Sequence, residues 1–245
     1  MTTSTAIPPS IMHTGIQTPA PHREDDELAL RTQIMFLQRS SKWTHKVQHF
    51  MKRSFDIVAA TLGLLMISPL LLIIAVMVKL DSPGPILYKS ERIGRNGRNF
   101  PMYKFRTMST NADALREQLR QQANLENGLF KMKDDPRVTN FGKLLRALSL
   151  DELPQLFNVV LGDMSLVGPR PLPPDESRLF QEPYTLRFRV YPGITGAWQV
   201  SGRSNLPFAT LCQLELDYIL QWSLLSDVRI LLKTLPAVLA SQGAY

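Results

Sequence analysis

Histidine and cysteine are scarce in this chain, and their positions exclude several classes of enzyme. The four histidines lie at positions 13, 22, 45 and 49, so the chain beyond position 49 contains none. This excludes Ser-His-Asp, Cys-His and common zinc hydrolase mechanisms from that region. The single cysteine, Cys212, excludes an internal disulfide framework, and its apolar neighbours are typical of a small buried side chain. Carboxylates are therefore the leading candidates for catalysis.

Acidic residues are fewer than basic ones, with 21 Asp and Glu against 28 Lys and Arg and a net charge of +7. Such an excess favours an acidic partner, which can be a nucleic acid, an anionic lipid or a phosphorylated substrate. The basic residues follow the edges of an apolar segment, and no recognised nucleic-acid-binding module is present. We therefore predict no nucleic acid as a partner, and charge alone does not choose between anionic lipid and a phosphorylated substrate.

The first 50 residues form one unit with two parts. Residues 1 to about 24 mix Thr, Ser, Pro and Gly, a composition that cannot bury enough surface to offset the entropy of ordering. We predict a disordered tail there. Residues 26 to 50 are typical of a basic amphipathic segment, for which a helix on anionic lipid and a solvated helix are both open.

Charge is absent from Ile57 to Val78, a run of 22 residues that is about long enough to cross hydrocarbon as a helix. Both flanks are basic, with six cations against one acid before the run and seven against two after it. The positive-inside rule therefore keeps both ends cytoplasmic. Proline bends a helix, and Ser68-Pro69 divides the run into halves of roughly 15 Å each. We predict a re-entrant helix-break-helix over residues 51–80, with an ordinary kinked span as the alternative.

Residues 81–245 are predicted to form a catalytic domain. Asn96-Gly97 is a strong hairpin signal, because both turn residues must accept positive φ. Helical patterns follow at residues 111–123, 141–148, 153–161, 207–222 and 225–240. The last two fit either the lipid interface, with Trp222 between them, or ordinary packing. The predicted fold is α+β and mainly helical, membrane-anchored by one re-entrant helix-break-helix, with a small β-hairpin and interfacial amphipathic helices.

Asp151 and Glu152 are adjacent carboxylates just before Pro154. Proline fits the first turn of a helix, so this helix starts no earlier than about Asp151. Both acids then lie at the positive end of the helix dipole, where a carboxylate stays ionised and a phosphate is attracted. An ionised aspartate beside a cation such as Arg146 suits nucleophilic attack on phosphorus. From these residues alone, a helix cap is the more frequent explanation of such a pair.

Six motifs, in order, resemble those of the bacterial sugar transferases, or monotopic phosphoglycosyl transferases. The resemblance runs from Lys52 to Tyr245. The motifs are KRSFDIVAA leading to the Ser68-Pro69 break, SPGPILYKSERIGRNG, KFRTM, DDPRVTNFGKLLRALSLDELPQL, GDMSLVGPRP and PGITGAWQVSGR. Within that family the chain looks like the short enzymes that load galactose or glucose phosphate onto undecaprenyl phosphate in exopolysaccharide synthesis.

The resemblance implies a ping-pong reaction at Asp151. The aspartate would attack the sugar-bearing phosphorus of a UDP-hexose and release UMP, and undecaprenyl phosphate would then take the sugar phosphate. Glu152 would be the partner acid, and Asp151 and Glu152 would hold Mg²⁺ as cofactor. A bacterial inner-membrane location follows, with the catalytic domain on the cytoplasmic face.

The resemblance also assigns phosphate-holding roles to Arg146 and Arg170. Pro169 and Pro171 fix the backbone on both sides of Arg170, which lowers the entropy lost on binding. Arg137 we interpret instead as a structural ion-pair partner.

Four further residues are candidates for substrate contact. Lys104 and Arg106 share parity along a strand and would face the diphosphate, although a membrane-surface role for Lys104 is equally open. Gln199 and Arg203 follow the Pro192-Gly193 turn and would contact the nucleotide.

Two other functions remain open at this point. A lipid-linked phosphate hydrolase would use water to resolve the aspartyl intermediate, and a basic membrane scaffold would perform no chemistry. The sequence does not distinguish galactose from glucose, because that choice depends on a few hydrogen bonds. It also leaves the oligomeric state open, with a homodimer as one arrangement.

Overall fold

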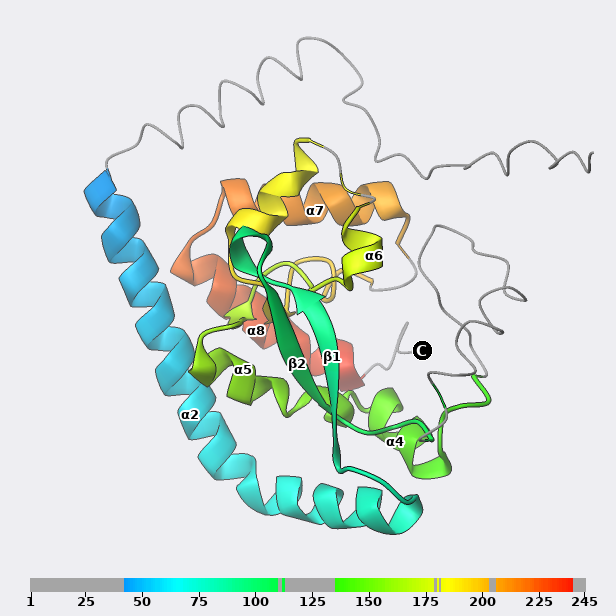
Figure 1. The fold of residues 1–245 in the computed structure, drawn as a ribbon. Helices are drawn as coiled ribbons and strands as arrows, with labels where there is room; N and C mark the ends of the chain where they lie inside the picture. Colours follow the sequence, from blue (N-terminus) through cyan, green and yellow to red (C-terminus); the bar gives the residue numbers. More distant parts are fainter. Residues whose placement is uncertain are drawn as a thin grey trace, which may run out of the picture.

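The computed structural model describes residues 42–109, 112, 135–178, 180, 182–202 and 206–239. Its first element, α2, is a 40-residue helix from Lys42 to Asp81. Figure 1 shows this helix running along the edge of the molecule and then turning beneath the other elements. The helix therefore runs without interruption across residue 50, where we expected the boundary between the N-terminal unit and the membrane segment. The predicted tail, most of the amphipathic segment and the 111–123 helix lie outside the described residues, apart from Ala112.

The expected break at Ser68-Pro69 is a bend within one continuous helix. Pro69 has no N–H to donate to the Leu65 carbonyl four residues back. Ser68 Oγ donates to that carbonyl at 2.9 Å and so replaces the missing backbone hydrogen bond. The helix therefore continues through the proline while changing direction, as Figure 1 shows. A re-entrant course through a bilayer stays a prediction.

Most of α2 is left uncovered by the rest of the described chain. Its segment Val47–Asp81 is long and apolar enough to cross a membrane, and only 11% of its apolar window is buried. Leu65, Met66 and Leu72 are all largely exposed. A core helix of a soluble protein buries such side chains, so this exposure favours a helix that is covered by lipid.

The predicted hairpin is confirmed. β1 (Leu87–Ile93) pairs antiparallel with β2 (Asn99–Phe105). In the connection, Asn96 has a φ of +59° and Gly97 a φ of +73°, the left-handed conformations that the sequence signal requires. The hairpin crosses the front of the molecule in Figure 1.

Three short helical elements follow, namely α4 (Asn140–Ala147), the 3₁₀ turn η3 (Leu150–Glu152) and α5 (Gln155–Leu161). α4 and α5 match the two helices predicted there, and η3 lies between them. The side chain of Thr139 caps α4 by accepting from the N–H of Gly142. Glycine is required at that position, because a Cβ would lie 2.2 Å from the backbone oxygen of Thr107.

A second, unpredicted sheet joins two distant motifs. β3 (Ser165–Val167) pairs in parallel with β4 (Gly193–Thr195). A Cβ on Gly168 would lie 2.4 Å from the Tyr191 carbonyl oxygen, and one on Gly193 would lie 2.1 Å from the nitrogen of Gly168. The two glycines thus allow the backbones of the motifs to touch.

The C-terminal part contains α6 (Pro174–Ser177), the 3₁₀ helix η4 (Tyr184–Arg189), α7 (Phe208–Leu220) and α8 (Leu224–Leu239). For α7 and α8 the sequence left open whether they pack in the interior or lie at the lipid interface, and the two helices differ in this respect. α7 is a packing helix that buries Phe208, Leu211 and Cys212 among others. α8 exposes an apolar stripe at helical spacing, formed by Leu225, Val228, Leu232 and Leu235.

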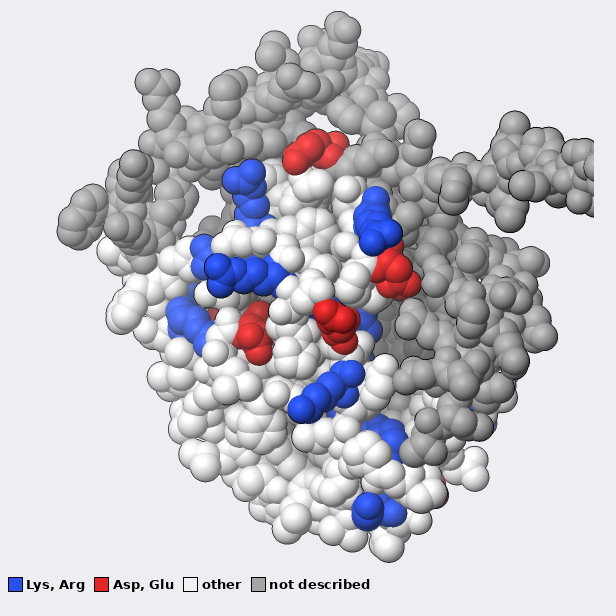
Figure 2. All heavy atoms as spheres, in the orientation of Figure 1, with Lys and Arg blue, Asp and Glu red and all other residues white. Residues whose placement is uncertain are grey.

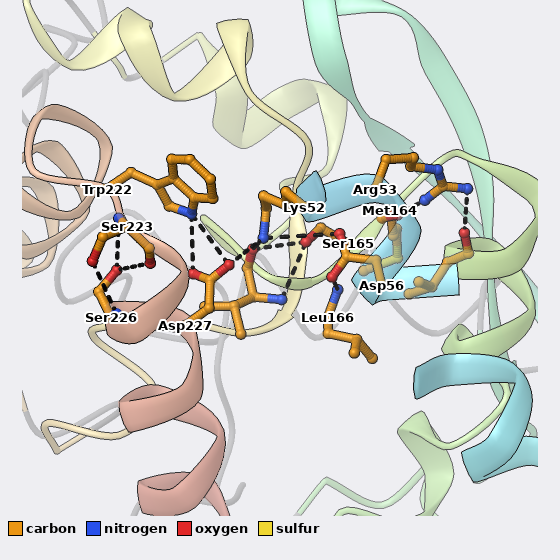
Figure 3. Close-up of polar contacts among 12 residues, drawn as sticks. Lys52, Arg53, Asp56, Met164, Ser165, Leu166, Trp222, Ser223, Ser226 and Asp227 are labelled. Carbon is orange, nitrogen blue, oxygen red and sulfur yellow. Dashed lines mark hydrogen bonds and ion pairs between the residues drawn. The ribbon is translucent and has the colours of Figure 1, made fainter. Parts of the chain in front are cut away.

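A polar cluster clamps the first half of α2 to β3 and α8 (Figure 3). Lys52 Nζ donates to Asp227 Oδ2 at 2.6 Å and to the Val167 carbonyl at 3.2 Å. Asp227 is fully buried and also accepts from the Tyr218 hydroxyl and the Trp222 indole N–H. Trp222 therefore has an internal partner, and α2 is fixed to the elements around it.

Arg53 adds a second attachment from the next position of α2. Its guanidinium donates to the Val159 carbonyl at 2.6 Å and to the Met164 carbonyl at 3.1 Å. These carbonyls lie at and after the C-terminal end of α5, where a cation also meets the negative end of the helix dipole.

Replacement of Asp227 by alanine should detach this clamp. The change removes the nearer carboxylate of the largely buried Lys52 and leaves only Asp56, at 3.8 Å, and removal of one partner of a buried ion pair typically costs about 3–5 kcal/mol. We expect the free energy of unfolding in detergent, measured with urea, to fall by that amount. Arg229→Ala on the exposed side of α8 is the control and should change it by less than about 0.5 kcal/mol. Equal effects of the two changes would contradict the clamp.

Candidate active site

The acidic pair Asp151 and Glu152 lies in η3, the turn between α4 and α5. Ser149 reverses the chain before it with a left-handed φ of +55°. α5 itself begins at Gln155, so the pair precedes the helix instead of forming its first turn. The side chain of Asp151 is about 90% buried, and Glu152 exposes 19% of its side chain.

Lys104 contacts both carboxylates. Along β2, Phe100 and Met102 are buried on the inward face, and Lys104 follows them at the same parity at the end of the strand. Its Nζ lies 2.7 Å from Glu152 Oε1 and 3.8 Å from Asp151 Oδ2. The sequence left Lys104 equally open as a membrane-surface cation, and the structure places it against the acidic pair.

Arg170 also contacts Glu152. It follows β3 and stands between Pro169 and Pro171, and its Nη2 donates to Glu152 Oε1 at 3.1 Å. The charge of Glu152 raises the pKa of Arg170 despite burial. Lys104 and Arg170 thus meet on a single carboxylate oxygen.

The two acids differ in their pKa values because the cations are divided unequally. Burial alone would raise the pKa of Glu152, but Lys104 and Arg170 together hold it well below its ordinary value. Burial raises the pKa of Asp151, and the charge of Glu152 adds to that rise, while Lys104 and Arg146 oppose it. The expected help of a helix dipole in ionising Asp151 stays a prediction, and the structure adds burial as an opposing influence on the pKa of this carboxyl.

Arg146 lies on α4 and faces the same region. Its Nε donates to Thr107 Oγ1 at 2.9 Å, which fixes the guanidinium. Burial lowers the pKa of Arg146, and the charges of Asp151 and Asp135 oppose that fall. Arg137 forms the expected ion pair with Asp135, at 2.6 Å between Nη2 and Oδ2.

Arg106 does not join Lys104 at the acidic pair. β2 ends at Phe105, so the alternation of side chains does not continue to Arg106. Its guanidinium donates to the carbonyls of Val78, Ser82 and Pro85, beside the C-terminal end of α2. Its observed contacts therefore attach the hairpin to the end of α2.

The remaining two predicted residues have different outcomes. Gln199 is buried and donates from Nε2 to the Ile194 carbonyl at 2.9 Å. Arg203 lies outside the described residues.

A cavity of about 1140 Å³ brings the predicted residues together. Its lining includes Lys104, Arg106, Arg146, Asp151, Glu152, Arg170 and Gln199. Figure 2 shows acidic and basic side chains interleaved over the hairpin on this face, while the lower edge along α2 carries few charges. The cavity thus contains cations that can bind a phosphate, with the acidic pair between them.

Arg92 also lines this cavity and was not among the candidates. It lies on β1, and burial together with the positive charge of Arg170 lowers its pKa to about 10. The alternation Tyr88, Ser90, Arg92 on the partner strand of Lys104 was the signal that could have identified it.

The pair Asp151 and Glu152 fits a divalent ion that takes only a few of its ligands from the protein. Among the described residues there is no group of three His, Cys, Asp or Glu side chains placed to hold a metal. Mg²⁺ is commonly bound through one or two carboxylates together with waters and substrate phosphates. Two adjacent carboxylates match that arrangement and not a closed protein cage.

Lys104→Met should destabilise the protein in a pH-dependent way. The pKa of Glu152 is depressed in the folded state, so its stabilising contribution is present above its ordinary value of 4.5 and is lost as the pH falls. We expect a loss of about 2 kcal/mol near pH 7 that shrinks toward about pH 3 in urea unfolding. Lys89→Met on the exposed side of β1 should show no such trend. A loss for Lys104→Met that is constant with pH would contradict the assignment.

The comparisons with known proteins show the family of this chain. The family model for bacterial sugar transferases matches residues 47–241. The chain is 42% identical over 218 residues to the exopolysaccharide production protein ExoY of Sinorhizobium fredii, covering 87% of this chain and 96% of that protein. It is 42% identical over 218 residues to the undecaprenyl-phosphate galactose phosphotransferase of Salmonella typhimurium, covering 87% of this chain and 45% of that protein.

A third relative is the UDP-glucose:undecaprenyl-phosphate glucose-1-phosphate transferase of Caulobacter vibrioides. The identity is 38% over 227 residues, covering 89% of this chain and 81% of that protein. The match to the family model thus covers the apolar part of α2, the hairpin and the acidic pair together. This chain is therefore an enzyme of the bacterial sugar transferase family.

Proposed function

We propose that this chain transfers a hexose 1-phosphate from a UDP-sugar to undecaprenyl phosphate, releases UMP and so initiates exopolysaccharide repeat-unit synthesis. The observation that carries the proposal is a buried aspartate, Asp151, placed beside a cation-bound Glu152 in a large cavity that is also lined by Arg146 and Arg170. The names of the Salmonella and Caulobacter relatives describe transfers of this kind. Because those names differ in the sugar, the proposal leaves the hexose open.

The proposed reaction has two displacements at phosphorus. In the first, an Asp151 carboxylate oxygen forms a bond to the phosphorus that carries the sugar, and the bond from that phosphorus to UMP breaks. In the second, an oxygen of the lipid phosphate attacks the same phosphorus, and Asp151 leaves as a free carboxylate. Each step forms and breaks one phosphorus–oxygen bond, so the enzyme returns to its starting state.

The cations of the cavity support both steps. Lys104 lies between the two carboxylates, where it opposes the raised pKa of Asp151 and favours the ionised form that attack requires. Arg170 and Arg146 are placed to neutralise the negative charge of the phosphates during transfer. The half-buried setting strengthens these interactions because less water screens them.

Mg²⁺ is the proposed cofactor, shared between Asp151, Glu152 and the donor phosphates. When bound, it would neutralise developing charge on phosphate oxygens. Glu152 keeps its ionised form through Lys104 and Arg170 and is thereby suited to remain a ligand near neutral pH.

We further propose that the enzyme lies in the bacterial inner membrane with its catalytic domain on the cytoplasmic face. The uncovered apolar surface of α2 and the exposed stripe of α8 support insertion into lipid. The bend at Ser68-Pro69 and the basic residues at both ends of the apolar run support a re-entrant course.

Asp151→Asn should abolish formation of a covalent intermediate. We expect mass spectrometry of the quenched wild type, given UDP-galactose or UDP-glucose without acceptor, to find a hexose phosphate adduct on Asp151. With radiolabelled donor and undecaprenyl phosphate, organic-phase product should fall by at least about 10³-fold in the variant. Asp217→Asn on α7, outside the cavity lining, is the matched control and should keep both signals. Free sugar phosphate in place of lipid product would indicate a hydrolase, and full activity of Asp151→Asn would exclude the mechanism.

The two ends of α2 should be labelled from the same side of the membrane. Cys212 is buried, so a Cys212→Ala background allows single cysteines at exposed Gln48 and Lys89. We expect a membrane-impermeant maleimide to modify neither cysteine in intact spheroplasts and both in inverted vesicles. Modification of Gln48→Cys in intact spheroplasts would show an ordinary span.

A further inference from the structure

A buried ion pair contacts the backbone of Arg170 and lines the same cavity, but the proposed chemistry assigns it no role. Arg187 on η4 and Glu215 on α7 approach to 3.2 Å, and their side chains expose only 3% and 4% of their surface. Burial lowers the pKa of Arg187 and raises that of Glu215, although each charge opposes the shift of the other. Such a pair contributes little net stability, because removing both charges from water offsets their attraction.

The pair holds both backbone groups of Arg170. Glu215 Oε1 accepts from the Arg170 backbone N–H at 3.1 Å, and Arg187 Nη2 donates to the Arg170 carbonyl at 2.6 Å. Because Pro169 and Pro171 have no N–H, the Arg170 N–H is the single backbone donor of this tripeptide. Glu215 therefore occupies that donor, and Arg187 occupies the acceptor on the same residue.

Arg187 is itself fixed by aromatic rings. Its guanidinium carbon lies 4.2 Å from the ring centre of Phe180 and 5.7 Å from that of Phe188. Cations over aromatic faces are held in defined positions. The aromatic cluster thus fixes the ion pair, and the ion pair fixes the backbone from which the Arg170 side chain reaches Glu152.

We propose that Arg187 and Glu215 are positioning residues that hold the Arg170 guanidinium on Glu152 by clamping the Arg170 backbone. The inference rests on the proposed function for its kinetic consequences, but the geometry itself concerns only Arg170 and its neighbours. Displacement of a charged group by about 1 Å can cost about 100-fold in rate. Loss of the clamp should therefore act on turnover.

The double variant Arg187→Met with Glu215→Leu tests this without leaving a buried charge. Replacement of a buried pair by apolar residues is often neutral or stabilising, but here the Arg170 N–H and carbonyl also lose their partners. We therefore expect a modest fall in the melting temperature, with the protein still folded at the assay temperature. We expect kcat for lipid transfer to fall by about 10- to 100-fold, with KM for the UDP-sugar changed much less. Cys212→Ala is buried on α7 one turn before Glu215 and serves as the packing control, with kcat unchanged. Unchanged kcat in the double variant overturns the proposal.

A combination with Arg170→Ala separates positioning from a general structural role. If the pair acts through Arg170, adding Arg187→Met and Glu215→Leu to Arg170→Ala should lower kcat no further. Multiplied losses would show that the pair acts elsewhere and would overturn the inference.

A measurement without sugar transfer distinguishes failure of this inference from failure of the proposed function. In the full chain labelled with ¹⁵N-arginine in detergent, the Nε–H signal of Arg170 is assigned by its loss in Arg170→Lys. We expect this signal to move toward the position of a solvated arginine in the double variant and to stay in place in Cys212→Ala. A signal that stays in place in the double variant overturns the clamp even if the enzyme transfers sugar phosphate, and a shifted signal supports it even if it does not.

Discussion

Two adjacent carboxylates can share a half-buried cavity only where cations compensate their charge, and the structure around Asp151 and Glu152 meets this constraint. Lys104 comes from β2, Arg170 from the loop after β3, and Arg146 from α4. Since these cations come from separate elements, the site exists only when the hairpin, the small parallel sheet and the helices are all in place. The unequal division of cations also separates the two acids, with Glu152 ionised and Asp151 harder to ionise.

The same assembly connects the acidic pair to the apolar helix. Lys52 on α2 and Tyr218 on α7 both donate to the Val167 carbonyl, and Arg170 follows three residues later. Arg53 holds the end of α5, the helix that the acidic pair precedes. The acidic pair and Arg170 are therefore attached to α2 by short hydrogen-bonded paths rather than by a flexible linker. A helix lodged in lipid would thus place the cavity at a fixed position relative to the membrane surface.

Local patterns predicted the parts of the fold that depend on neighbouring residues. The Asn96-Gly97 turn, the helices near 141–148, 153–161, 207–222 and 225–240, and the uncharged run were all visible because φ preferences and hydrophobic periodicity act over a few residues. The parallel pairing of β3 with β4 was not visible, because it depends on close approach of glycines that are 25 positions apart in the sequence. Arg106 lines the same cavity, but its guanidinium contacts the end of α2 instead of the acidic pair, because parity along a strand holds only as far as the strand extends.

The sequence by itself determined the nature of the protein: a basic chain without histidine in its catalytic part, an apolar segment bent by proline, an acidic pair before a helix, and motifs of a transferase family. Only the tertiary structure decided which cations contact the acidic pair and that Arg92 lines the same cavity. It also decided that Arg187 and Glu215 bind the backbone of Arg170. The physical reason is that chemical type and local conformation are encoded by neighbouring residues. Electrostatic compensation depends on distances between residues that are far apart in the chain, and those distances exist only after folding.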